Sequence, residues 1–253
     1  MSNVRRFQVK LYKYCDLKEG DAEALSRLHS VLREQSFWCA QPDTLNDDQE
    51  FAWRCDYKPT AQTTALLAGL LMCERGWEFA AAWEQIEPYI AAGNLERSAE
   101  PIIRSLIQQC RSEVGLLCLG TSPNNSTLWS RYAANGEGVC IEIDVPESLI
   151  NTHFFPVQYA QEKVVHIDEL MLSYFADPTN MYSYALLTKL NLWAPEEEVR
   201  FISMAQNVAV RIDGAQIASI YLGRRLSKIT EDHVRSIAKS LPYEILFRPQ
   251  PSA

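Results

Sequence analysis

The chain has 253 residues, of which 47% are hydrophobic and 22% charged, and this balance is typical of a folded globular protein. Its formal net charge is −8, and no stripe of Lys and Arg is present that would neutralise the phosphates of duplex nucleic acid. No apolar run approaches the roughly 18 residues that span a bilayer, and the first residues lack the apolar segment of a signal peptide. We therefore expect a cytoplasmic protein that binds neither duplex nucleic acid nor membranes.

Familiar metal, redox and nucleotide motifs are missing from the sequence. The seven cysteines are odd in number, and no pair has C-x-x-C spacing, so we expect reduced thiols and no zinc site. The four histidines are scattered without the spacing of a helical metal site. No glycine-rich dinucleotide loop, P-loop or G-x-S-x-G pattern occurs. The sequence thus predicts no bound metal ion, and it lacks the familiar dehydrogenase, P-loop, α/β-hydrolase and zinc-protease signatures.

The first fifty residues predict two strands around one helix. Alternating residues over 7–15 predict a strand, and Asp21 then caps a helix that runs to about residue 35. A short strand is predicted over 36–40. An acidic turn that leads into a short helix follows at 41–50.

Residues 60–112 predict three consecutive helices, the first running from Thr60 to Gly76. The first is apolar on every side over 65–73, so it should be buried all round. Pro88 should kink or shorten the second helix, and Pro101 falls in the first turn of the third. An apolar stripe at helical spacing marks the core side of the second helix: Phe79, Trp83, Ile86 and Ile90.

After residue 113 the apolar period changes from 3.6 to 2, which predicts a strand-rich half. Strands are predicted at 114–120, 139–145, 154–159, 198–204, 208–213, 217–222 and 243–247. Helices are predicted at 126–133, 167–175, 180–191 and 230–240. This order is typical of an α+β fold with a mostly antiparallel sheet and a helical insertion. We expect one domain over 1–253, with 60–112 as a helical subdomain.

The first candidate for chemistry is the run Glu196-Glu197-Glu198-Val199-Arg200. In a strand, Glu196, Glu198 and Arg200 would share one side. A carboxylate held beside a cation can stabilise the positive charge that develops on a sugar in an oxocarbenium-like transition state. The alternative is a solvated strand start with a local ion pair. We take Glu198, Arg200 and Glu196 as candidate catalytic residues.

The second candidate is the segment Leu128-Trp129-Ser130-Arg131-Tyr132-Ala133. Trp129 and Tyr132 are three apart and would share a helical face. Such a pair can stack on a flat ligand, for example a base or nicotinamide. The alternative is a helix whose two aromatic residues pack on the sheet.

Three further segments have both a binding and a structural interpretation. Acidic residues 43–50 could bind a divalent cation or could begin a capped helix. Lys13, flanked by tyrosines, could pair with a phosphate or carboxylate or could point outward from an amphipathic strand. Arg224 and Arg225 follow a strand end and indicate an anion site.

Six short motifs occur in order along roughly residues 10–225: Leu-Tyr-Lys-Tyr, Pro-Asp-x-Leu-Asn-Asp, Leu-Trp-Ser-x-Tyr-Ala, Gly-Val-Cys-Ile-Glu-Ile-Asp, Glu-x-Glu-x-Arg and Ile-Tyr-Leu-Gly. This order resembles a large family of bacterial proteins that carry a domain of unknown function and are similar to AbiGi-type abortive-infection proteins. The chain departs from the family at Val199, where Trp is usual, and at Asp48, where Pro is frequent.

The layout of that family is similar to that of ADP-ribosyltransferase-like domains, so the resemblance implies NAD as a substrate. It implies that Glu198 holds the ribose and stabilises the cation, and that Arg200 orients Glu198. It also implies a set of residues that bind the dinucleotide and flank the nicotinamide: Lys13, Tyr14, Trp129, Ser130 and Tyr132.

The leading hypothesis is therefore an enzyme that transfers ADP-ribose from NAD, linked to phage defence. One rival is a non-catalytic, antitoxin-like or protein-binding module, which predicts an exposed apolar patch and an ion pair of Glu198 and Arg200 at the surface. Another is a metal-dependent phosphodiesterase, whose acids would have to converge: Asp47, Asp48, Glu142 and Asp144. The expected partner is thus a small-molecule nucleotide or a protein.

Overall fold

A computed structural model describes residues 8–47, 53–56, 60–177 and 185–252. The chain divides into two compact units that are each assembled from separate segments. The sheet unit comprises residues 1–41, 114–157 and 192–253, and the helical unit comprises residues 42–113 and 158–191. The predicted helical segment 60–112 lies within the helical unit, which also takes in a later part of the chain.

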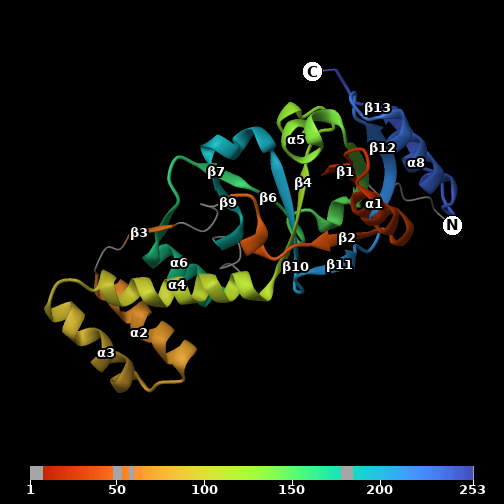
Figure 1. Cartoon of the computed structure of the whole chain (residues 1–253). Helices are drawn as coiled ribbons and strands as arrows, with labels where there is room; N and C mark the ends of the chain where they lie inside the picture. Colours follow the sequence, from red (N-terminus) through yellow and green to blue (C-terminus); the bar gives the residue numbers. More distant parts are fainter. Residues whose placement is uncertain (1–7, 48–52, 57–59, 178–184, 253) are drawn as a thin grey trace. The chain divides into compact units, whose positions relative to one another are not determined.

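The sheet unit is built on one seven-stranded sheet (Figure 1). Its strands, in spatial order, are β13 (Leu246–Pro249), β12 (Gln216–Leu222), β5 (Val139–Pro146), β1 (Gln8–Cys15), β4 (Gly115–Gly120), β10 (Glu198–Ser203) and β6 (Phe154–Pro156). All neighbours are antiparallel except β12 and β13, which are parallel. A second antiparallel pair joins β2 (Ser36–Cys39) to β11 (Val208–Arg211). The predicted α+β class with a mostly antiparallel sheet is confirmed.

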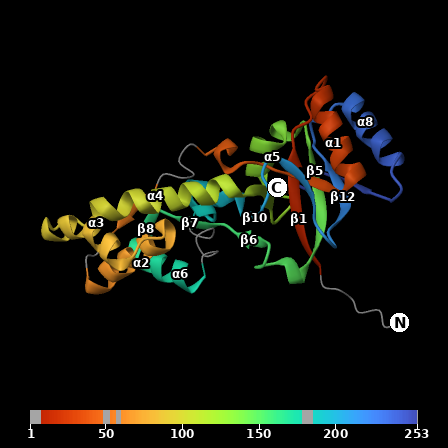
Figure 2. The same ribbon diagram turned by 90° about the horizontal axis from the view of Figure 1, so that it is seen from below.

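Two helices cover one face of this sheet and one short helix covers the other (Figure 2). The first face carries α1 (Ala22–Glu34) and α8 (Lys228–Lys239), and the second carries α5 (Ser126–Tyr132). Asp21 caps α1 as predicted, because its carboxylate accepts a hydrogen bond from the backbone N–H of Ala24 at 2.8 Å. Short 3₁₀ helices complete the unit: η2 (Ala134–Gly136), η3 (Glu147–Leu149) and the end of η4 (Asn191–Glu196).

Alternation along the central strands supplies two cores, one on each face of the sheet. Leu11 of β1 and Ile141 of β5 face α1 and α8, whereas Tyr14 and Cys140 face α5. Lys13 pairs across the strands with Ile141, and Tyr14 pairs with Cys140. Lys13 and Tyr14 therefore leave the sheet on opposite sides.

The described residues of the helical unit form four long helices and two short parallel ladders. The helices are α2 (Ala61–Arg75), α3 (Phe79–Ala91), α4 (Glu96–Glu113) and α6 (Ile167–Ala176), with η1 (Pro42–Thr44) at the start of the unit. The ladders pair β3 (Arg54–Asp56) with β8 (Val164–His166) and β7 (Gln158–Ala160) with β9 (Thr188–Leu190). Thr60 caps α2, and Gly76 ends it with a φ of 64°, as predicted.

The apolar patterns of α2 and α3 misled the prediction of burial. Ala65 and Cys73 of α2 are exposed, so this helix buries one side and not its whole surface. In α3, Ile86 is buried, but Phe79 and Ile90 are exposed. Helical periodicity shows which residues share a face, but it does not show whether another element covers that face.

Pro88 lies near the end of its helix, whereas Pro101 lies outside its predicted position. Helix α3 continues for three residues beyond Pro88, because a proline near a helix end removes one hydrogen bond in a turn that is about to stop. Helix α4 begins at Glu96, so Pro101 lies beyond its first turn. The start of α4 was therefore predicted too late.

One predicted strand and one predicted helix differ in the structure. The chain over 154–159 switches partners: the N–H of Val157 donates to Glu198 O, whereas the N–H of Gln158 donates to Leu187 O. The segment therefore divides into β6 and β7, and alternation cannot reveal such a switch. Of the helix predicted at 180–191, residues 180–184 lie outside the described residues, and Thr188–Leu190 is strand β9.

Candidate functional site

Glu198 and Arg200 form an ion pair on β10 that is removed from solvent. Arg200 Nε donates to Glu198 Oε1 at 2.8 Å, and Nη2 lies 3.4 Å from Oε2. Glu198 is 5% exposed and Arg200 is fully buried. The predicted alternative, a solvated strand start, does not describe this pair.

The position of this pair on the sheet follows from the register of β10 against β4. Glu198 stands opposite Gly120, and Arg200 stands opposite Cys118. A Cβ atom on Gly120 would lie 2.5 Å from Leu128 Cδ1, so any larger residue here would force the Leu128 side chain of α5 to shift. Glu198 and Arg200 thus lie on the α5 side of the sheet.

A buried ion pair of this kind adds little net stability. Removing two charges from water costs several kcal/mol each, and the bidentate geometry offsets this cost only in part. Apolar side chains of similar volume would stabilise the strand about as well. The net stability of the fold therefore does not by itself account for this pair.

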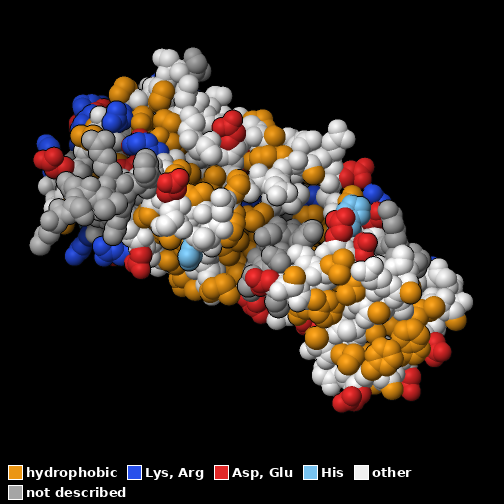
Figure 3. Space-filling view, turned by 180° about the vertical axis from the view of Figure 1, so that it is seen from behind, with side chains coloured by type: hydrophobic (Ala, Val, Ile, Leu, Met, Phe, Trp, Pro, Cys, Tyr) orange, Lys and Arg blue, Asp and Glu red, His pale blue; other side chains and the backbone are white. Residues whose placement is uncertain are grey.

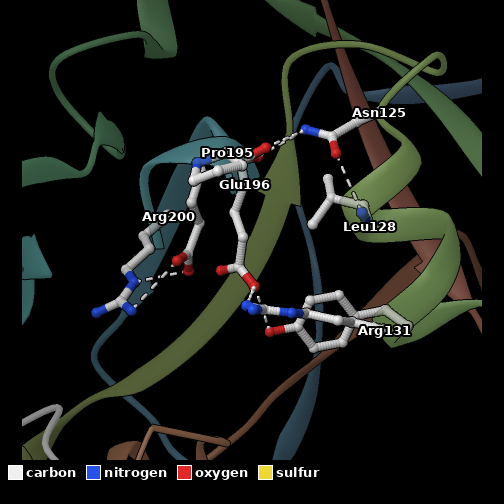
Figure 4. A network of polar contacts seen from close by, with 8 residues as sticks. Asn125, Leu128, Arg131, Pro195, Glu196 and Arg200 are labelled. Atoms are coloured by element: carbon white, nitrogen blue, oxygen red, sulfur yellow. Dashed lines mark hydrogen bonds and ion pairs between the residues drawn. The ribbon is translucent and has the colours of Figure 1, made fainter. Parts of the chain in front are cut away.

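Glu196 is a second buried acid next to this pair, at the end of η4. It is 2% exposed, and its Oε1 accepts a hydrogen bond from the hydroxyl of Tyr132 at 2.9 Å and one from Arg131 Nη1 at 3.1 Å (Figure 4). The guanidinium of Arg131 also lies over the ring of Trp193, 4.4 Å from its centroid. Each acid therefore has an arginine of its own.

Glu197 lies between the two buried acids and marks a turn in the chain. Its φ of 46° is in the left-handed region, which a residue with a Cβ rarely adopts. The carboxylate of Glu197 accepts a hydrogen bond from Thr121 Oγ1 at 3.0 Å, and its side chain is exposed. The chain thus turns at Glu197 between η4 and β10.

The side chain of Asn125 joins α5 to η4. Its Oδ1 accepts a hydrogen bond from the N–H of Leu128 at 3.1 Å and so caps α5. Its Nδ2 donates to the carbonyl of Pro195 at 2.7 Å (Figure 4). One amide therefore holds Arg131 and Tyr132, at the end of α5, in register with Glu196.

Cys118 adds a neutral thiol beside Glu198. Burial, together with the nearby negative charge of Glu198, raises the pKa of Cys118 to about 12. The thiol is therefore protonated at neutral pH.

Two predicted cofactor-binding residues are part of the core below α5. Trp129 is 3% exposed, and its Nε1 donates to Pro123 O at 2.8 Å. Tyr14 donates its hydroxyl to Ser122 O at 2.7 Å and meets the Trp129 ring edge to face at 5.3 Å. Burial raises the pKa of the Tyr14 hydroxyl. Neither ring offers a free face to nicotinamide, so the structural interpretation of this aromatic pair describes Trp129 better.

Lys13 and Ser130 lie apart from the two acids as well. Lys13 is on the opposite face of the sheet, where its Nζ donates to Cys118 O at 3.3 Å. The hydroxyl of Ser130 is exposed and donates to Asn135 Oδ1 at 2.8 Å. Of the five predicted cofactor-binding residues, Tyr132 is the one that hydrogen-bonds to a predicted acid.

Three residues of the site were not predicted from the sequence. Arg131 stands inside the aromatic motif, but its aromatic neighbours gave the stronger signal. Trp193 precedes Glu196 by three residues, which places both on one side of a 3₁₀ turn. Asn125 has the signature of a helix cap, but no local signal reveals its bond to Pro195.

Glu142, an acid of the phosphodiesterase hypothesis, is held by other groups. It is 2% exposed and accepts hydrogen bonds from Tyr221 at 2.9 Å and from Lys10, with the Tyr12 hydroxyl at 3.5 Å. Burial alone would raise the pKa of Glu142, but the hydrogen bonds from Lys10 and Tyr221 outweigh it and the pKa is lowered. Lys10 Nζ also lies 3.4 Å from Asp144. One lysine thus pairs with both acids on β5.

The other binding interpretations receive little support. Asp47 belongs to the helical unit, and Asp48 lies outside the described residues. Arg225 pairs with Glu137 at 2.7 Å, and Arg224 donates to Pro251 O at 2.6 Å, so both cations are engaged within the chain. In the described residues no group of three or more His, Cys, Asp or Glu side chains is arranged to hold a metal ion.

Comparisons with known proteins do not place the chain in a family. The chain matches no family model, no curated protein and no solved structure. The resemblance drawn from the six motifs therefore stays a prediction. No helix in the described parts of the chain is long and apolar enough to cross a membrane.

Proposed function

We propose that this chain is an ADP-ribosyltransferase-like enzyme that uses NAD. Its centre is the acid cluster, defined as Glu196, Glu198, Arg131, Tyr132 and Arg200. The observation that carries the proposal is that two adjacent buried carboxylates are each held by a separate arginine. Fixed negative charge in a site with little water stabilises a transition state in which a sugar becomes positive.

The proposed reaction breaks the bond between the ribose C1 and the nicotinamide nitrogen. The electron pair leaves with nicotinamide and neutralises its ring, while C1 gains oxocarbenium character. Glu198 stabilises this charge and accepts a hydrogen bond from a ribose hydroxyl. An acceptor nucleophile then forms a bond to C1 and passes its proton to Glu196. Arg200 is a positioning residue, because it acts through Glu198.

Arg131 and Tyr132 of the cluster, together with the neighbouring Trp193, are suited to the rest of NAD. The Arg131 side chain is 39% exposed, and a guanidinium pairs well with the oxygens of a pyrophosphate. Tyr132 and Trp193 are half-buried, so their rings replace Trp129 as the proposed surface for nicotinamide.

Calorimetric titration with NAD tests the binding part of this proposal. The unchanged chain should bind NAD, and Arg131→Met should weaken binding about tenfold, since it removes one charge-assisted contact. Arg27→Met is the matched control, because Arg27 is an exposed arginine on α1. Absence of NAD binding by the unchanged chain, or equal affinity in both variants, would overturn the proposal.

On the same resemblance, we propose a role in phage defence. Bacteria that express the unchanged chain should form fewer plaques after phage infection than bacteria that express Glu198→Gln. Equal plaque numbers at equal protein levels would contradict this role.

One observation favours a second candidate, a protein-binding module. Helix α3 of the helical unit exposes Phe79, Tyr89 and Ile90 to solvent. The same hypothesis also expected Glu198 and Arg200 at the surface, and both are buried. We therefore assign protein binding to α3 as an activity separate from the acid cluster.

A further inference from the structure

Helix α3 presents an apolar side that its own unit covers only in part. On this side Ile86 is buried and Trp83 is half-buried, whereas Phe79 is 54% exposed and Ile90 is 37% exposed. The rings of Phe79 and Trp83 stack at 5.8 Å with 25° between their planes. Residues 79, 83, 86 and 90 lie along one side of the helix, so they form one apolar stripe that is buried at Ile86 and exposed at both ends.

This stripe leads into a pocket of about 380 Å³. Its walls come from α3, the turn after α3 and the first turn of α2: Trp83, Ile90, Gly93, Leu95, Thr60, Ala61 and Thr64. The volume is in the range of ligand pockets, and it can accept one or two large side chains. We call the pocket together with Trp77, Phe79, Trp83, Tyr89 and Ile90 the α3 surface.

Acidic side chains border the α3 surface. Glu78, Glu84 and Glu87 are exposed, and the sequence has no Lys or Arg over residues 76–96. In Figure 3 an area of apolar side chains on the part formed by α2 and α3 has acidic side chains at its edge. The surface is therefore apolar in the middle and negative at its border.

The acidic border of the α3 surface favours one kind of binding partner over the others. A second copy packed symmetrically on the same surface would place acid against acid, in a chain whose net charge is already −8. A small apolar ligand would fill the pocket but leave Phe79 and Tyr89 in water. A segment with apolar anchors and basic flanks would satisfy both the stripe and the border.

We infer that the α3 surface binds an amphipathic helix of a partner protein whose apolar face is flanked by Lys and Arg. The anchors of that helix, three or four residues apart, lie along the stripe, and one of them enters the pocket. This inference rests on the protein-binding candidate and does not depend on NAD chemistry.

The test uses a fluorescent amphipathic Leu/Lys peptide of about five helical turns, titrated into the full chain and followed by polarisation. Binding should weaken at least tenfold in the Phe79→Ser/Ile90→Ser variant, and a similar loss is expected for Glu84→Lys/Glu87→Lys. A peptide of the same length with Glu in place of Lys should not bind. Ile229→Ser is the matched control, because Ile229 is 58% exposed on α8 of the sheet unit, and it should leave binding unchanged.

Three results would overturn the inference. The first is no binding of the Leu/Lys peptide, and the second is equal binding by the charge-reversed variant. The third is a dimer in sedimentation that dissociates in Phe79→Ser/Ile90→Ser, since this would make a second copy the occupant. Circular dichroism shows that each variant is folded, and NAD titration of Phe79→Ser/Ile90→Ser should match the unchanged chain, which separates this test from that of the acid cluster.

Discussion

Glu142 and Glu198 are two buried glutamates in one row of the same sheet face, yet their surroundings differ. The row runs across the strands from Glu142 through Tyr12 and Gly120 to Glu198. Glu142 meets a lysine that is 53% exposed and two tyrosine hydroxyls, whereas Glu198 meets an arginine that has no exposure. Equal position in a sheet therefore does not give equal chemistry.

The difference lies in how each charge is compensated. Lys10 reaches Glu142 from solvent, so the charge of this pair is partly screened by water. Arg200 and Glu198 are both buried, so water screens their charges less. Their mutual attraction, and the cost of separating them, are therefore larger than for Lys10 and Glu142. Glu142 therefore fits a structural role, and the chemical role of Glu198 stays part of the proposal above.

The largest expected effect follows from separating the buried pair. Arg200→Met removes the guanidinium from a carboxylate that stays buried, so the free energy of unfolding should fall by about 3–5 kcal/mol. Urea denaturation at pH 7 measures it. In the double variant Glu198→Leu/Arg200→Met most of this loss should disappear, because both buried charges are removed together. A loss below about 1 kcal/mol in the single variant would instead indicate an ordinary surface pair.

A smaller loss, with a distinct pH dependence, is expected at Glu142. Glu142→Gln should cost about 2 kcal/mol at pH 7, the range for hydrogen bonds to a charged group. The pKa of Glu142 is lowered in the folded chain, so its contribution is present above the ordinary value of 4.5 and is lost as the pH falls through the folded-state pKa. Unfolding free energies of the two proteins, measured from pH 7 to pH 3, should therefore converge at the acidic end. A constant difference would contradict this explanation.

Asn125 tests how α5 is tied to the acid cluster. Asn125→Ala removes the cap and the donor to Pro195, and should cost about 1–2 kcal/mol. Asn125→Asp keeps an acceptor for the N–H of Leu128 and removes only the donor, so it should cost less. Thermal unfolding of the two variants measures the difference. Equal losses would mean that the cap contributes nothing.

Cys118 gives the smallest effect, on reactivity and not on stability. Glu198→Gln removes the negative charge next to the thiol, so the pKa of Cys118 should fall from about 12 while burial keeps it above the ordinary 9.0. Alkylation of Cys118 at pH 10, followed by peptide mass spectrometry, should then be faster. Glu142→Gln should leave that rate unchanged, and an equal increase in both variants would argue against a specific contact with Glu198.

The sequence was sufficient for those features that depend on local signals. Asp21, Thr60 and Gly76 mark helix ends by their own side-chain or backbone chemistry, and alternation marked the strands of the sheet. The acids of the site were found because Glu196 and Glu198 stand next to Arg200 in the chain.

What the sequence could not reveal depends on contacts between distant segments. The burial of Trp129 depends on how closely α5 packs on the sheet, and the side on which Lys13 lies depends on strand register. The aromatic motif predicted that Trp129 and Tyr132 act together, but only Tyr132 turns to an acid. The exposure of Phe79 depends on what covers α3, which periodicity does not encode.

The most direct test of the account is the initial rate of nicotinamide release from NAD, measured for the unchanged chain, Glu198→Gln and Glu142→Gln. Removing one preorganised charge from a transition state typically costs about 10²–10³ in rate. We predict release by the unchanged chain, a loss of that size in Glu198→Gln and a near-normal rate in Glu142→Gln at 25 °C. No release by the unchanged chain, or equal losses in the two variants, would contradict the assignment of chemistry to the acid cluster.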